Sequence, residues 1–86
     1  MHIQLIHGQF SAQDAIDIIT HMIQIKVKYH ESKITSNSTI EDIKMREAKI
    51  KRLQKDLSEV RNYIEQEDTI MVHSEITLSN NNGKKA

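Results

Sequence analysis

Cysteine and proline are absent from this 86-residue chain, and glycine occurs only at positions 8 and 83. Without cysteine the chain can form neither a disulfide nor a thiolate metal site. Without proline, and with no glycine between Gly8 and Gly83, long helices in the middle of the chain contain no residue that breaks them. A chain this short has a marginal core, so oligomerisation is the main remaining source of stability.

The chain also has few aromatic residues and no formal net charge. Only Phe10, Tyr29 and Tyr63 carry aromatic rings, which favours helix packing over a deep aromatic ligand pocket. The 12 basic and 12 acidic side chains cancel, so no overall charge draws the chain to nucleic acid or to a membrane. The first residues lack the pattern of a signal peptide, and charged residues interrupt the most apolar segment, 15–27. We therefore expect a cytoplasmic protein without a membrane partner.

The hydropathy pattern predicts the order strand, helix, helix, strand within one domain, residues 1–78. The expected elements are a short strand over 2–7 that Gly8 ends, helices over 12–34 and 39–67, and a strand over 69–78. The polar residues 79–86 are expected to form a flexible tail.

Capping signals support both helix starts. Ser11 precedes the first helix, with Asp14 three residues later, and Ser38 with Glu41 matches a capping box before the second. Because the loop between them is short, the helices must pack antiparallel. The predicted fold class is therefore mainly α: an antiparallel, coiled-coil-like two-helix hairpin flanked by short terminal β-strands.

The first helix has one more apolar seam than a monomer can bury. The second helix shows a single heptad seam, which can cover only one side of the first. The surplus seam comprises Ala15, Ile18, Met22, Ile25 and Tyr29. We expect this seam to meet the same seam of a second copy, so that the homodimer forms a four-helix bundle with Met22 near its axis.

Charge supports an antiparallel pairing of two copies. Residues 26–55, next to the loop, carry nine Lys or Arg against four Asp or Glu. Residues 1–25 and 56–78, at the open end of the hairpin, carry one Arg against eight Asp or Glu. Antiparallel copies would place basic halves against acidic halves, which selects orientation more than affinity.

A basic cluster on the second helix is a candidate surface for an anionic partner. Its members are Lys44, Arg46, Lys49, Lys51, Arg52 and Lys55. They could follow a nucleic-acid backbone, or they could form a solvated face that complements an acidic protein surface. No aromatic residues interleave with them for base stacking, and we favour the second interpretation.

Histidines and carboxylates give weaker signals. If the strands pair, His2 and His7 could approach His73 and Glu75 as a Zn²⁺ site, but exposed strand histidines are the simpler expectation, and we predict no metal and no cofactor. The run that ends the second helix, residues 65–68, has carboxylates but no sign of a desolvated pocket, so we predict no enzyme. The last strand could pair with the first strand, with its copy in a dimer, or with another protein's sheet.

The sequence thus predicts a small non-enzymatic interaction or assembly protein that acts as a homodimeric helical hairpin with an unidentified protein partner. The alternative is a nucleic-acid-associated protein that uses the basic half of the second helix.

Overall fold

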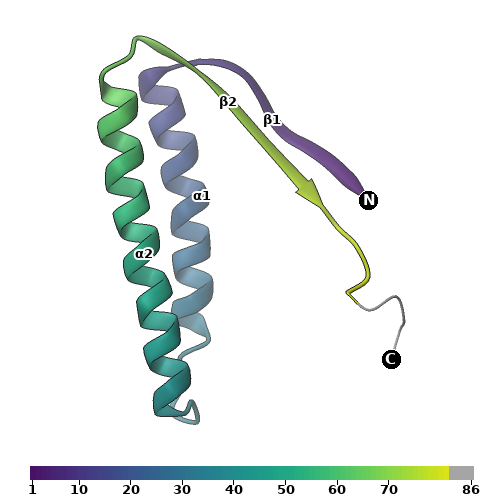
Figure 1. Cartoon of the computed structure of the whole chain (residues 1–86), viewed down its shortest axis with the longest axis vertical. Helices are drawn as coiled ribbons and strands as arrows, with labels where there is room; N and C mark the ends of the chain where they lie inside the picture. Colours follow the sequence, from purple (N-terminus) through teal and green to yellow (C-terminus); the bar gives the residue numbers. More distant parts are fainter. Residues whose placement is uncertain (82–86) are drawn as a thin grey trace.

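The computed structural model describes residues 1–81, and the last five residues of the predicted tail lie outside this range. The chain forms β1 (His2–Ser11), α1 (Ala12–Ser32), α2 (Ile40–Glu65) and β2 (Thr69–Thr77). The helices form an antiparallel hairpin, and the strands pair into a ribbon that leaves its open end and runs obliquely away beside α1 (Figure 1). Leu78 extends the pairing, since its N–H donates to the Met1 carbonyl at 2.7 Å.

The helix starts follow from their caps. The Ser11 hydroxyl accepts a hydrogen bond from the Asp14 N–H at 3.1 Å, which fixes the start of α1 where the sequence places it. At α2 the predicted cap is wrong by one residue, because the Thr39 hydroxyl caps the helix by accepting from the Asp42 N–H at 3.0 Å. Ser38 instead closes the loop, where its hydroxyl accepts from the Thr35 N–H at 2.9 Å.

β1 is longer than predicted, whereas β2 ends at Thr77, one residue before its predicted end. β1 continues through Gly8, which lies opposite Val72 rather than ending the strand. Gly8 has φ of 155°, a conformation that other residues rarely adopt. The register runs antiparallel from Phe10 opposite Ile70 to His2 opposite Thr77, with a bulge between Gln4 and Ile6. One face of the ribbon, which carries Ile70 and Val72, turns toward the helices.

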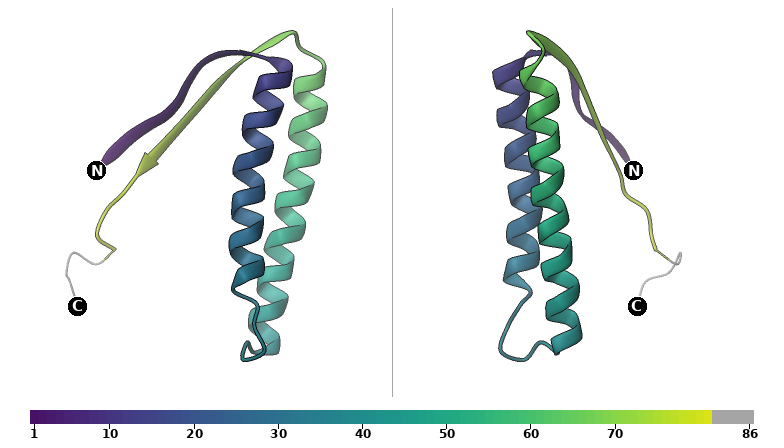
Figure 2. Two further views of the ribbon diagram at one scale, coloured as in Figure 1. Left: turned by 180° about the vertical axis from the view of Figure 1, so that it is seen from behind. Right: turned by 60° about the vertical axis from the view of Figure 1, so that its left-hand side comes forward.

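The predicted fold class is wrong in two respects. Strand accounts for 23% of the described residues against 58% helix, so the chain is an α+β protein with a two-stranded antiparallel sheet and not a mainly α hairpin. The dimeric four-helix bundle also fails, because it needs Ala15 on a free surface. Ala15 is 0% exposed within its own chain, where the ribbon packs beside that end of α1 (Figure 2).

The core is small and lies at the open end of the hairpin, where all four elements meet. Ala15, Ile16 and Ile64 are its buried members. Phe10 of β1 and Ile70 of β2 pack against them from the ribbon. A core of this size gives limited stability, so each of its side chains should carry a large share.

Ile64 is the side chain on which this core most depends. It is 2% exposed, so Ile64→Ala leaves a cavity among all four elements and should lower the free energy of unfolding by about 2–5 kcal/mol. Ile40→Ala, the same change at a position that is 72% exposed, should cost less than about 0.5 kcal/mol. Urea unfolding followed by circular dichroism measures both, and equal losses would contradict this location of the core.

Candidate interaction surfaces

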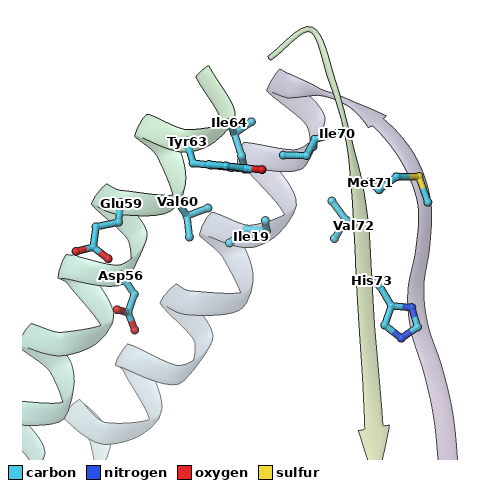
Figure 3. Close-up of a pocket in the computed structure, with 10 residues that line it drawn as sticks. All are labelled: Ile19, Asp56, Glu59, Val60, Tyr63, Ile64, Ile70, Met71, Val72 and His73. Carbon is cyan, nitrogen blue, oxygen red and sulfur yellow. The ribbon is translucent and has the colours of Figure 1, made fainter. Parts of the chain in front are cut away.

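An apolar cleft lies beneath the near end of the ribbon, between β2 and the two helices. It has a volume of 610 Å³. Its apolar lining comes from Ile19 of α1, Val60, Tyr63 and Ile64 of α2, and Ile70 and Val72 of β2 (Figure 3). The carboxylates of Asp56 and Glu59 stand at its wall on α2. The cleft therefore continues the core outward, and its border is acidic.

Farther from the open end, the ribbon and α1 diverge (Figures 1 and 2). Both leave apolar side chains exposed there. On β2, residues 70, 72, 74 and 76 share the face that turns toward the helices. Ile76 of that face and Ile3 opposite it are each 38% exposed. On α1, Met22 is 37% and Ile25 is 69% exposed. We call Met22, Ile25, Ile3 and Ile76 the open apolar faces.

The surplus seam of α1 is therefore divided by the fold. Ala15 is buried in the core and Ile18 is half-buried, while the seam is exposed from Met22 to Tyr29. The sequence correctly shows that α1 is apolar on two sides. It does not show that the ribbon of the same chain covers one end of the second side.

The six basic residues predicted on α2 do not form one surface. Arg46, Lys49 and Arg52 face α1, where Arg46 lies 5.9 Å from the centre of the Tyr29 ring and the other two line a hollow beside it. Lys44, Lys51 and Lys55 are exposed, and their spacing of seven and four residues places them on a different side of α2.

The three α2 residues that face α1 lie beside basic residues of α1 itself. Lys26 lines the same hollow of 390 Å³, and the Lys33 ammonium lies 5.6 Å from the Tyr29 ring centre. We call the five cations Lys26, Lys33, Arg46, Lys49 and Arg52 around Tyr29 the basic–aromatic cluster. Among residues 1–81, no Lys or Arg side chain forms an ion pair with a carboxylate. Within that range the cations of the cluster thus form no ion pair, although Asp56 lines the same hollow.

His30 is buried behind this cluster. Arg46 contacts its Nδ1 at 3.0 Å, and its Nε2 is buried without a hydrogen-bond partner among the described residues. Burial lowers the pKa of His30 from its ordinary value of 6.5, and the charges of Arg46, Lys49 and Lys26 lower this pKa further. The neutral ring therefore accepts from Arg46 at Nδ1 and carries its hydrogen on Nε2.

The outward face of the ribbon collects polar and titratable side chains. His7 and His73 are cross-strand partners whose Nδ1 atoms lie 3.1 Å apart. His2 Nε2 lies 2.7 Å from one oxygen of Glu75, and His73 Nε2 lies 3.6 Å from the other. The pairing that the sequence left open thus occurs within one chain and brings all four side chains into one row. Within residues 1–81, no group of three or more such side chains is arranged to hold a metal ion.

No known protein family, curated protein or solved structure matches this chain. None of the helices within residues 1–81 is both long and apolar enough to cross a membrane. Function must therefore be inferred from the surfaces themselves.

The lowered pKa of His30 makes a prediction about stability and pH. Below pH 6.5 the unfolded chain binds a proton at His30 that the folded chain resists, so stability should fall as pH falls from 6.5 toward the lower folded-state pKa. Replacing the ring by His30→Gln should flatten this part of the pH profile of unfolding free energy. His21→Gln, at an exposed position, should leave the profile as in wild type, and identical slopes for all three proteins would contradict the assignment.

Proposed function

We propose that this chain is a small non-enzymatic assembly protein that acts by binding a second copy of itself. The observation that carries the proposal is the pair of open apolar faces, because a ribbon of two strands with an uncovered apolar face is marginally stable in water. A second copy placed against α1 and the far end of the ribbon would bury Met22, Ile3 and Ile76 together. This arrangement uses the ribbon, and it differs from a bundle of four helices.

Charge favours a second copy over an unrelated protein as the occupant. The loop half, residues 26–55, carries nine Lys or Arg against four Asp or Glu, and it includes the basic–aromatic cluster. The remaining described residues carry one Arg against eight Asp or Glu, including Asp56 and Glu59 beside the cleft. Two antiparallel copies would therefore place each basic half against an acidic half. A single chain supplies both complementary surfaces.

Self-association gives a direct test by light-scattering mass over a concentration series. The wild-type chain should have the mass of a dimer. Met22→Glu and Ile76→Glu place a charge on each open apolar face and should raise the dissociation constant at least tenfold, because burying an unpaired charge is costly.

The matched control is Ala48→Glu, which adds the same charge at an exposed position of α2 on the side of Lys44 and Lys51. This variant should dimerise like wild type. Circular dichroism separates loss of the dimer from loss of the fold in each variant. A monomeric wild type at every concentration would remove the proposal.

The basic–aromatic cluster favours a second candidate function, binding of a nucleic-acid backbone. Its cations have no carboxylate partners within residues 1–81, and Tyr29 beside them is 53% exposed and can stack on a base. The outer lysines, Lys51 and Lys55, provide a matched comparison on the same helix. If the cluster binds phosphates, the double change Lys49→Glu with Arg52→Glu abolishes retardation of single-stranded RNA.

A mobility-shift series at increasing salt tests this candidate. Lys51→Glu with Lys55→Glu changes the net charge equally and should retain most of the retardation. Retardation that both double variants lose equally would indicate nonspecific attraction to charge, and no retardation of wild type at low salt would exclude the candidate.

A further inference from the structure

We propose that His7 and His73 form a two-imidazole binding site for a divalent transition-metal ion on the outward face of the ribbon. The two rings lie on the face of β1 and β2 opposite Ile70 and Val72, the side chains that pack against the helices, and His73 also borders the apolar cleft. The site uses none of the open apolar faces on which the proposed self-association depends. Imidazole nitrogen is a preferred ligand of Zn²⁺, Ni²⁺ and Cu²⁺, and at such a site Cu²⁺ binds more tightly than Zn²⁺.

The backbone register holds the two rings at the separation that one metal ion requires. His7 pairs directly with His73 across the ribbon, and their Nδ1 atoms lie 3.1 Å apart. Two nitrogens bound to one tetrahedral Zn²⁺ at about 2.0–2.1 Å lie roughly 3.3 Å from each other. The rings are also nearly perpendicular, at 86°, so their Nδ1 atoms approach without stacking. An ion can therefore replace the single hydrogen that the two nitrogens now share.

Glu75 acts as a positioning residue for one of the two ligands. Its Oε1 lies 3.6 Å from His73 Nε2, the ring atom opposite the proposed ligand atom. A carboxylate at Nε2 favours the tautomer with hydrogen on that nitrogen, which leaves Nδ1 unprotonated and free to bind metal. The other oxygen, Oε2, lies 2.7 Å from His2 Nε2, so His2 holds the carboxylate in place.

The site is open. The described residues bring no third metal ligand to it, and the side chain of His73 is 50% exposed. Water therefore completes the coordination shell in a single chain. Such a site binds the free ion reversibly, and its occupancy links β1 to β2 at the middle of the ribbon.

Isothermal titration of the full chain without an affinity tag, with Zn²⁺ alone and then Cu²⁺ alone, tests the site. One ion should bind per chain, with Cu²⁺ bound at least tenfold more tightly. His7→Gln and His73→Gln should each weaken Zn²⁺ binding at least tenfold, and Glu75→Gln should weaken it by a smaller factor. Each histidine variant should show a cooperative thermal transition without metal, which shows that it is folded. Zn²⁺ should raise the thermal midpoint of wild type but not of either histidine variant.

Two further variants separate this site from other histidine sites. His21→Gln on α1 should bind Zn²⁺ within twofold of wild type. His2→Gln tests chelation by the terminal amine and His2, because that mode would make it the most damaging change. The proposal is overturned if His2→Gln abolishes binding while His7→Gln does not, or if wild type binds no Zn²⁺ at millimolar concentration.

Discussion

The contact of Ile64 with the first turns of α1 and with the ribbon holds the four elements together. At this point α2 ends, α1 begins, and both strands join the helices. The Ala12 N–H donates to the Asp68 carbonyl at 3.0 Å, so a backbone hydrogen bond ties the two strand–helix junctions beside the buried Ile64. This contact fixes the orientation of the ribbon relative to the helical hairpin. Within residues 1–81, no second buried cluster of apolar residues packs the ribbon or the hairpin farther from this end.

A core confined to one end explains why the rest of the chain is so exposed. Along the hairpin, the apolar residues between α1 and α2 are only half-buried, as at Ile23, Val27 and Leu53. Along the ribbon, Ile70 and Val72 pack against the core, and farther along, the ribbon and the helices diverge (Figure 2). The hydrophobic effect favours covering such faces, and a second copy offers both apolar surface and complementary charge. The proposed assembly therefore follows from where the core ends.

Local signals in the sequence predict the elements well, because they depend on near neighbours. Ser11 caps α1 as its spacing to Asp14 indicates. The Ser38 cap predicted for α2 is wrong by one residue, because the Ser38 hydroxyl bonds within the loop and the Thr39 hydroxyl caps the helix. Contacts between side chains of different helices could not be predicted from the sequence. Helical spacing alone does not show that Arg46 and Lys49 gather with Tyr29 of another helix while Lys51 does not, because that depends on the rotation of α2 against α1.

The histidine row shows most clearly how one backbone irregularity decides a surface. His2 and His7 are five residues apart, so a regular strand would place them on opposite faces. The bulge between Gln4 and Ile6 inserts one unpaired residue, Leu5, and returns the side chains beyond it to the other face. His2 thereby reaches Glu75 on the face that carries His7. On the opposite face the same bulge aligns Ile3 with Ile6 opposite Ile76 and Ser74. A single inserted residue thus creates both the continuous apolar face and the polar row behind it, which a reading based on strict alternation cannot foresee.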